Sequence, residues 1–457
     1  MLDDLKNIFS SDRVLTDSES LDTYGRDWTK HLDVNATAIV FPKSTEEVQK
    51  LVLWANKNKV GLVPSGGRTG LSGAATAIQN EVVVSFEKMN NILEFDPVDQ
   101  TVRCEAGVIT ETLQEYAKDK NLLYPVDFAA RGSSQIGGNI ATNAGGIKVI
   151  RYGLTRNWVT SLKVVTGTGE VLELNKNLVK NATGLDFRHL FIGSEGILGF
   201  ITECTMKLTR PPKESQVFVL GVSELSSVME IYKTYTQSRE VLAFEMFTEL
   251  ALQYVLKSTD LQRPFDSPTN YYVLIELEIE NEGDSEQAMT LFEKCFENGW
   301  VEDGAVSQSP TQAKDFWRLR EDISEATSAY EPYKNDVSVR VSKVPEFLQE
   351  TDQILSTEYP NFDVVWFGHI GDGNLHINVL KPKELSTEQF MESCKTVNEH
   401  LFGMIKKFEG SVSAEHGVGV TKKPYLSLTK SPQEIGLMRN LKAIFDPNGI
   451  MNPGKVI

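Results

Sequence analysis

The sequence predicts an α+β protein made of two kinds of unit, the first rich in glycine and the second poor in it. Three glycine-rich segments, residues 64–73, 133–146 and 193–199, fall in the first part of the chain. Beyond Pro211 and Pro212, strand-like and helix-like stretches alternate with few glycines. Two successive prolines stop a strand, so they mark the predicted domain boundary. A chain of 457 residues allows about three units at roughly 150 residues each.

Composition narrows the choice of partner. Hydrophobic residues make up 40% and charged residues 24%, which is typical of a soluble globular protein. Acidic residues outnumber basic ones by 63 to 46, so the net charge is -17. Nucleic acid and anionic membranes need clustered Lys and Arg, and both are therefore disfavoured as partners. An anionic substrate requires a local basic pocket.

Cysteine usage and the lack of long apolar runs lead us to expect a cytoplasmic protein. The four cysteines are far apart and form no CxxC pair, as expected in a reducing compartment. The start, MLDDLKNIFSSD, is acidic where a signal or transit peptide would be basic or acid-poor. No apolar run approaches the ~18 residues of a membrane span, so we expect no integral membrane segment. Peripheral contact with a membrane stays compatible with this pattern.

The first unit reads as a βαβ arrangement that ends in a glycine-rich loop. Residues 37–41 form a buried-strand run, and Ser44 with Glu47 makes a capping box that opens an amphipathic helix. A short strand at 60–63 leads into the loop at 64–73, where glycines allow backbone N–H groups to approach an anion. The spacing fits neither GxGxxG nor a P-loop, and a plain glycine-rich turn is an equal alternative.

The other two glycine-rich segments favour a ligand-binding role for this loop over a plain turn. Strand-like runs at 82–86 and 101–106 and a helix-like run at 110–120 precede residues 133–146, and residues 193–199 precede a strand at 200–208. Small residues at such density indicate backbone lying close against a flat or bulky ligand. Three such segments together favour one extended cofactor.

The second unit alternates strands and helices. Strand-like runs at 217–222 and 271–279 alternate with helix-like runs at 224–238 and 285–298, which predicts helices on one face of a sheet. Helical periodicity continues through 311–330 and ends in the polar stretch 330–336. A helix at 431–444 and a turn-rich tail at 446–455 complete the chain.

Residues 366–378, WFGHIGDGNLHIN, offer the first candidate chemistry. Asp372-Gly373 favours a type I′ hairpin turn, which would pair His369 with His376 on one face, with Asn378 beside them. Such a pair is half of a metal site or, as the alternative, two structural histidines. Residues 413–417, SAEHG, supply a third ligand in Glu415 and a base in His416, which favours the metal site.

Six motifs in order resemble the flavin-dependent D-2-hydroxyacid dehydrogenases of the vanillyl-alcohol oxidase superfamily, which has the PCMH-type FAD-binding fold. They are PSGGRTGLSGA at 64–74, GGNIATNAGG at 137–146, GSEGILGFIT at 193–202, GHIGDGNLHIN at 368–378, SAEHGVG at 413–419 and DPNGIMNPGK at 446–455. The resemblance spans nearly the whole chain. It is nearest to the D-2-hydroxyglutarate dehydrogenases, with the D-lactate dehydrogenases next.

The resemblance implies three parts. Residues 1–210 would form a two-subdomain PCMH-type FAD-binding domain, residues 211–420 an α+β substrate cap with an antiparallel sheet and the metal site, and residues 421–457 a segment that returns to the FAD domain. The FAD should be non-covalent, because no histidine lies between positions 60 and 77. The implied cofactor contacts are Pro64, Ser65, Gly66, Gly67, Arg68, Thr69, Gly70, Gly137, Gly138, Asn139, Thr142, Asn143, Gly146, Ile201 and Asn452.

The resemblance also implies the reacting groups. His369, His376 and Glu415 would bind a divalent metal, commonly zinc, and His416 would be the catalytic histidine. The implied substrate-binding residues are Arg320, Ser324, Lys334 and Asn378. Ser324 stands where the family has Thr, and the spacing to Lys334 is one residue shorter. Judged without the resemblance, Arg320 would be a solvated helix residue paired with Glu321 or Asp322.

The implied reaction is FAD- and metal-dependent oxidation of a D-2-hydroxyacid. D-2-hydroxyglutarate would become 2-oxoglutarate, with His416 taking the hydroxyl proton while hydride passes to flavin N5. Alternatives are oxidation of D-lactate to pyruvate, a flavoprotein oxidase of the same fold without metal chemistry, and a structural metal-binding module. An electron-transfer flavoprotein, a quinone or a cytochrome would accept the electrons, and a homodimer is compatible with the resemblance.

Overall fold

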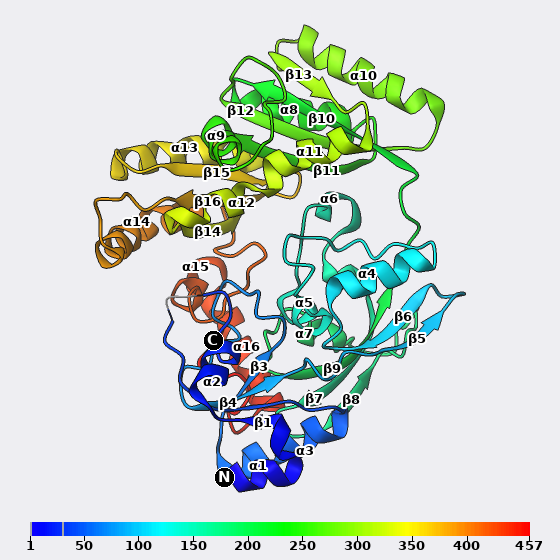
Figure 1. Cartoon of the computed structure of the whole chain (residues 1–457), viewed down its shortest axis with the longest axis vertical. Helices are drawn as coiled ribbons and strands as arrows, with labels where there is room; N and C mark the ends of the chain where they lie inside the picture. Colours follow the sequence, from blue (N-terminus) through cyan, green and yellow to red (C-terminus); the bar gives the residue numbers. More distant parts are fainter. Residues whose placement is uncertain (1, 30–31) are drawn as a thin grey trace. The chain divides into compact units, whose positions relative to one another are not determined.

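The computed structural model describes residues 2–29 and 32–457 and divides into two compact units (Figure 1). Unit 1 takes residues 1–146, 153–211 and 415–457, and unit 2 takes residues 147–152 and 212–414. The chain therefore passes from one unit to the other four times. Within the described residues, no helix is long and apolar enough to cross a membrane.

Unit 1 contains a four-stranded sheet with the order β1 (Val14–Leu15), β2 (Ala36–Val40), β4 (Glu81–Ser85), β3 (Leu62–Ser65). Strands β2, β4 and β3 are parallel, and helix α3 (Thr45–Asn58) connects β2 to β3. The predicted capping box is confirmed in part, since the Glu47 N–H donates to Ser44 Oγ at 3.3 Å. The Glu47 carboxylate accepts from Arg13 at 2.6 and 2.9 Å, which ties α3 to the start of the chain.

A second, five-stranded antiparallel sheet completes unit 1. Its order is β5 (Ile92–Asp96), β6 (Thr101–Glu105), β9 (Gly199–Lys207), β7 (Val159–Thr166), β8 (Val171–Leu174). The strands predicted at 101–106 and 200–208 are confirmed, whereas β5, β7 and β8 were not predicted. The helices of this unit are α1 (Leu2–Ile8), α2 (Ser18–Tyr24), α4 (Thr110–Asp119), α5 (Ile136–Thr142), α7 (Arg188–Phe191), α15 (Leu426–Thr429) and α16 (Pro432–Phe445).

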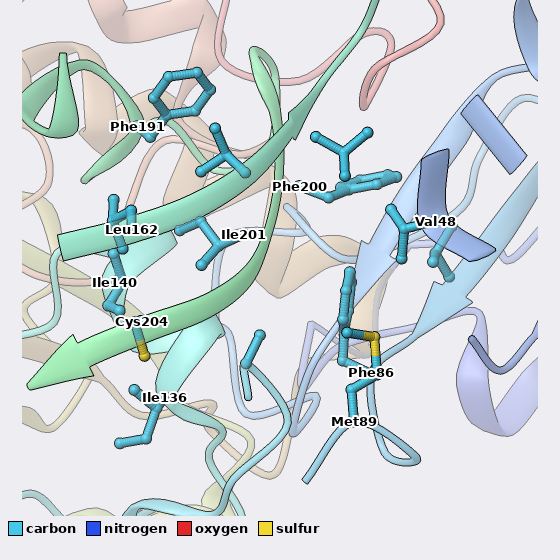
Figure 2. Packing of buried hydrophobic residues seen from close by; sticks show 14 of the residues in the cluster. Val48, Phe86, Met89, Ile136, Ile140, Leu162, Phe191, Phe200, Ile201 and Cys204 are labelled. Carbon is cyan, nitrogen blue, oxygen red and sulfur yellow. The ribbon is translucent and has the colours of Figure 1, made fainter. Parts of the chain in front are cut away.

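One apolar core joins the two sheets of unit 1 (Figure 2). The rings of Phe86 and Phe200 meet edge to face at 5.9 Å, one from the end of β4 and the other from β9. Ile136 and Ile140 of α5 are fully buried in the same core. Aromatic pairs of this geometry add to the stability that area burial supplies.

Unit 2 is built on a seven-stranded sheet in which every pair is antiparallel. Its order is β13 (Asp303–Val306), β10 (Glu214–Val222), β12 (Tyr271–Ile279), β11 (Val241–Thr248), β15 (Val364–His369), β16 (Asn374–Val379), β14 (Tyr333–Ser338). Its helices are α6 (Val149–Tyr152), α8 (Leu225–Thr236), α9 (Glu249–Ser258), α10 (Glu282–Glu297), α11 (Pro310–Glu321), α12 (Ile323–Ala326), α13 (Val344–Glu358) and α14 (Thr387–Lys407).

The prediction that helices cover one face of this sheet is wrong. Phe218 of β10 packs against Tyr235 of α8, whereas Val219, its neighbour on the opposite face, belongs to a core shared with α9 and α11. The central strands are apolar at consecutive positions and are buried on both faces. Continuous apolar runs of this kind indicate a sheet covered on both sides.

Candidate functional site

The three glycine-rich segments of unit 1 meet at one cavity of about 100 Å³. Its lining residues are Pro64, Gly66, Ala74, Ala75, Phe86, Ala106, Gln135, Gly137, Gly138, Ala141, Thr142, Ser194, Glu195, Gly196, Gly199, Phe200 and Ile201. The predicted cofactor residues Pro64, Gly66, Gly137, Gly138, Thr142 and Ile201 are among them. The walls are mostly apolar, which suits a bound aromatic ring system.

Glycine is required at several places in this wall and next to it, because chain segments lie in close contact there. A Cβ on Gly67 would lie 2.0 Å from the Ser133 carbonyl oxygen, and one on Gly137 would lie 2.6 Å from Ala106 Cβ. At Gly138, in contrast, a Cβ would meet no atom within 4 Å. Gly138 therefore leaves open space beside the cavity, which suits a ligand that approaches the backbone closely.

The remaining predicted cofactor residues are not among the lining residues. They are Ser65, Gly67, Arg68, Thr69, Gly70, Asn139, Asn143, Gly146 and Asn452. Several are engaged with the protein itself. The Asn139 amide donates to Thr110 Oγ1 at 2.6 Å, and Asn143 Oδ1 accepts from the Arg156 N–H at 3.0 Å. Their side chains hold the loops that form the cavity.

Two buried polar atoms near the cavity fit a ligand with a polar edge. Gln135 Oε1 and Asn452 Oδ1 have no hydrogen-bond partner among the described residues, and both side chains are almost fully buried. An unsatisfied buried acceptor is costly and calls for a partner. The Asn452 amide is fixed by donating to the Ala74 and Glu195 carbonyls at 2.9 and 2.7 Å. These atoms and the mostly apolar walls fit FAD.

The predicted hairpin at 366–378 has a longer turn than expected. His369 pairs with Asn374 and Phe367 with His376, so the predicted pairing of His369 with His376 is wrong. Gly373 has φ +84°, and Asp372 Oδ1 accepts the Asn374 N–H at 3.0 Å, whereas a type I′ turn needs positive φ at both central residues. The register shift is two residues, which keeps the same side chains on the same face.

We call that face the polar face of unit 2: Glu245, Arg320, Asp336, His369, His376 and Asn378. His376 lies directly opposite Asp336 of β14, and Asn378 lies opposite Lys334. The His369 and His376 rings are 5.4 Å apart and nearly perpendicular. The strand β14, which the polar composition of 330–336 concealed, therefore places Lys334 and Asp336 on this face.

Glu245 connects two predicted site residues. Its Oε1 lies 2.9 Å from His369 Nδ1, and its Oε2 lies 2.9 Å from Arg320 Nη2. Both charged side chains are at least 94% buried. A carboxylate on one ring nitrogen favours the tautomer that leaves the other nitrogen free as a ligand atom. One weak sign of this role is visible in the sequence, a single acid within the apolar run VLAFEMFT.

Arg320 is not the solvated helix residue that its sequence context alone predicts. Its guanidinium lies 4.7 Å from the Phe367 ring centre, and its partner is Glu245, whereas Arg318 takes Asp322. The ion pair with Glu245 lacks hydrogen-bond geometry, because Arg320 Nε and Nη2 have no acceptor among the described residues. Asn378 Nδ2 is likewise a buried donor without an acceptor there. Ser324 of α12 is half-buried.

Asp336 is fully engaged on the same face. Its Oδ1 accepts from Asn374 Nδ2 at 2.7 Å and lies 3.8 Å from His376 Nδ1, and its Oδ2 accepts the Ala414 N–H at 3.1 Å. A carboxylate held by several donors keeps a fixed orientation. Sequence reasoning did not select Asp336 as a site residue.

Among the described side chains, Asp336, His376, Glu415 and His416 have ligand atoms within 4.8 Å of one another. His376 and Glu415 belong to the predicted metal triad, and the group contains Asp336 and His416 in place of His369. Two imidazoles and two carboxylates suit a divalent first-row metal. Ala414, bonded to Asp336, directly precedes Glu415 in the chain.

Two family models match the chain. Residues 36–175 match the FAD binding domain, and residues 211–456 match the C-terminal domain of FAD linked oxidases. A D-2-hydroxyglutarate dehydrogenase of Stutzerimonas stutzeri is 56% identical and covers 100% of this chain and 98% of its own. One of Xanthomonas citri is 53% identical over 97% of this chain and 94% of its own.

More distant relatives carry other names. A putative mitochondrial D-lactate dehydrogenase of Schizosaccharomyces pombe is 34% identical over 97% of this chain and 86% of its own. The solved structure of p-cresol methylhydroxylase superposes with a TM-score of 0.78 at 16% identity, covering 100% of this chain and 96% of its own. That likeness confirms the predicted PCMH-type fold.

Proposed function

Because this chain belongs to the FAD-linked oxidases that include the D-2-hydroxyglutarate dehydrogenases, we propose that it oxidises D-2-hydroxyglutarate to 2-oxoglutarate with FAD as the electron acceptor. The observation that carries the choice of substrate is the set of buried donors on the polar face. Arg320 Nε, Arg320 Nη2 and Asn378 Nδ2 have no acceptor among the described residues. Carboxylate oxygens would satisfy them.

Each residue has a part in this proposal. Arg320 holds one substrate carboxylate through its fork, and Lys334, directly opposite Asn378, attracts carboxylate as a point charge. Asn378 donates to the substrate, and Ser324 offers a hydroxyl. His416 takes the proton of the substrate hydroxyl. Bound FAD would accept the hydride, and a divalent metal, zinc being the first choice, would lower the pKa of that hydroxyl.

Two arrangements of the metal ligands follow from the residues. In the first, His369, His376 and Glu415 bind the metal, and Glu245 orients His369. In the second, Asp336 and His416 are ligands, and His416 is then unavailable as the base, because one ring nitrogen would bind the metal and the other already carries the N–H of the neutral imidazole. The first arrangement accounts for the Glu245 contact with His369 and is the one that we propose.

The direct test is anaerobic reduction of the bound flavin. D-2-hydroxyglutarate should bleach the oxidised flavin band, whereas L-2-hydroxyglutarate should leave it intact. Persistence of oxidised flavin with every D-2-hydroxyacid tried would refute the proposal. Reduction by D-lactate at a matching rate would favour the D-lactate alternative, which the name of the 34% identical relative also supports.

A pair of variants tests the carboxylate clamp. Arg320→Lys keeps the charge beside Glu245 but loses the planar fork, so the concentration of D-2-hydroxyglutarate for half-maximal reduction should rise about tenfold or more. The matched control is Arg318→Lys, which changes a partly exposed arginine on the same helix. Equal behaviour of the two variants would remove Arg320 from the substrate site.

Reduced flavin must pass its electrons on, and we propose an electron-transfer flavoprotein, a quinone or a cytochrome as the partner. Turnover with each acceptor in place of oxygen distinguishes them. A dimer, if formed, will appear in the molar mass measured by light scattering. An oxidase of the same fold would reoxidise rapidly in air with no added acceptor and would show no loss of activity on metal removal.

A further inference from the structure

Glu195 has a backbone conformation that a glutamate adopts only under constraint. Its φ is +49°, and the glycines at 193 and 196 beside it have φ of +82° and +76°. Side chains other than glycine are disfavoured in this left-handed region, so a glutamate there needs compensating contacts. A turn alone would be served better by glycine.

The main chain of Glu195 is held by two segments of unit 1. Its N–H donates to the Ala141 carbonyl at 2.8 Å, and its carbonyl accepts from Asn452 Nδ2 at 2.7 Å. Ala141 lines the flavin cavity, as does Glu195 itself. The residue is therefore fixed at the cavity wall before its carboxylate is considered.

The carboxylate holds a third segment, the loop of residues 415–419. The Val418 N–H donates to Oε1 at 2.7 Å, and the Gly419 N–H donates to Oε2 at 2.8 Å. The approach is close, because a Cβ on Gly417 would lie 3.0 Å from the Glu195 carboxyl carbon. Gly417 and Gly419 both have positive φ, +81° and +49°. His416 immediately precedes this turn.

We propose that Glu195 is a positioning residue whose carboxylate fixes the 415–419 loop, and with it the His416 imidazole, beside the flavin cavity. The role follows from the contacts. The Glu195 carboxylate, at the cavity wall, accepts hydrogen bonds from the Val418 and Gly419 N–H groups, which belong to the loop that carries the predicted base. This inference rests on the proposed function only for what His416 does to the substrate. The hold on the loop is independent of it.

The pKa of Glu195 reflects both its burial and its two bonds to the loop. The side chain is 5% exposed, and burial, together with the nearby Asp27 charge, raises its pKa to about 7, against the two loop amides that lower it. The ionised carboxylate is acceptor-only at both oxygens, and it is the form that the two loop amides stabilise. Burial of a carboxylate costs free energy because the charge loses its hydration, and hydrogen bonds such as the two from the loop offset that cost.

The test compares Glu195→Gly with Gln100→Gly. Both substitutions relieve a positive φ, +49° and +52°, but Gln100 lies in an exposed turn of unit 1 away from the cavity lining. In Glu195→Gly, amide exchange of Val418 and Gly419 should accelerate at least about tenfold, since their acceptor is gone. Flavin reduction by D-2-hydroxyglutarate should slow by about ten- to a hundredfold, because a misplaced base transfers the proton poorly.

If Glu195 only stabilised the fold, its replacement would also lower FAD content and substrate affinity. The positioning role predicts a loss in the rate of reduction alone. FAD content, flavin spectrum and the substrate concentration for half-maximal reduction should stay within about twofold of wild type in Glu195→Gly, so that the loss falls on the rate of reduction alone. Gln100→Gly should change none of these quantities. Unchanged exchange at Val418 and Gly419, or wild-type reduction despite faster exchange, would overturn the inference.

Glu195→Gln serves where Glu195→Gly fails to bind FAD. Glutamine keeps the shape but replaces one acceptor by a donor, so one loop amide loses its partner and the same changes should follow at smaller size. Wild-type exchange and reduction in Glu195→Gln would also overturn the inference. If the wild-type flavin is not reduced by any D-2-hydroxyacid, the proposed function fails, while the exchange measurements still decide the hold on the loop.

Discussion

The flavin cavity of unit 1 and the polar face of unit 2 are built in opposite ways. The cavity exists because side chains are missing, as at Gly137 and Gly138, so that main chain itself forms part of the wall. The polar face exists because ionisable side chains are buried, as Glu245 and Arg320 are, each at least 94% inaccessible. The cavity therefore tolerates additions badly, and the polar face tolerates removals badly. The predictions below test this contrast.

The largest effect is expected from Glu245→Gln on the polar face. The substitution leaves the buried Arg320 charge without its partner, which costs about 3–5 kcal/mol of unfolding free energy. Loss of the contact with His369 should also weaken binding of the proposed divalent metal, about 10–100-fold. Urea unfolding and competition with a chelator measure the two quantities.

The double variant Glu245→Leu with Arg320→Met is the control for this prediction. Removing both charges leaves no unpaired ion, so it should be more stable than Glu245→Gln. Equal destabilisation of the two variants would show that packing, and not charge, makes the polar face sensitive.

The next effect is expected from an added methyl group in the loop that continues from the cavity wall. Gly67→Ala forces a methyl group against the Ser133 carbonyl, which costs about 1–3 kcal/mol and should reduce FAD content. Gly138→Ala adds the same methyl group in open space and should leave the stability of the FAD-free protein within about 0.5 kcal/mol. FAD affinity should nevertheless fall, because the methyl group occupies ligand space. Unaltered FAD affinity in Gly138→Ala would mean that the flavin does not approach this position.

Glu195 is the one buried acid of the cavity lining, and it makes stability depend on pH. Its pKa rises from 4.5 to about 7 on folding, so the folded protein keeps a proton that the unfolded chain has already lost. The contribution of this retained proton to the free energy of unfolding is fully present below pH 4.5 and is lost as the pH rises through 7. Glu195→Gln should therefore remove part of the fall in unfolding free energy between pH 5 and 7. Parallel curves for the two proteins would contradict this assignment.

The smallest effect is expected at Ser324, at the edge of the substrate residues. Ser324→Thr adds one methyl group to a half-buried position on α12 and should change the half-saturating concentration of D-2-hydroxyglutarate by at most about threefold. Ser324→Ala tests the hydroxyl itself. A tenfold effect of either change would place Ser324 in direct contact with the substrate.

The cavity could be predicted from sequence because the residues that line it lie in short, continuous motifs. Glycines at 66, 137 and 138 stand in short segments that line the cavity, and three such segments in order predict one extended cofactor. The strand–helix–strand pattern around Ser44 and Glu47 was readable for the same reason. Only β6 and β9 of the five-stranded sheet could be predicted, and β5 and β8 were missed since they are short and partly exposed.

The polar face was harder to predict because its contacts are distant in the chain. Glu245 lies 124 residues from His369, and no local pattern relates them. Asp336 was concealed because YKNDVS is too polar to read as a strand, although β14 buries its central residues. The hairpin register was wrong by two residues, and the even shift is the reason that the histidines still share a face.

The last residues of the sequence complete the first unit. Met451 bridges to Leu62 beside β3, the fully buried Lys455 ammonium pairs with Glu81 of β4 at 2.8 Å, and Asn452 bonds to Glu195. A ribosome must therefore synthesise all of unit 2 before unit 1 can close. Until then, Glu81 and the strand edge at Leu62 lack their partners, so a nascent chain stalled before residue 450 will be prone to aggregation and to proteases.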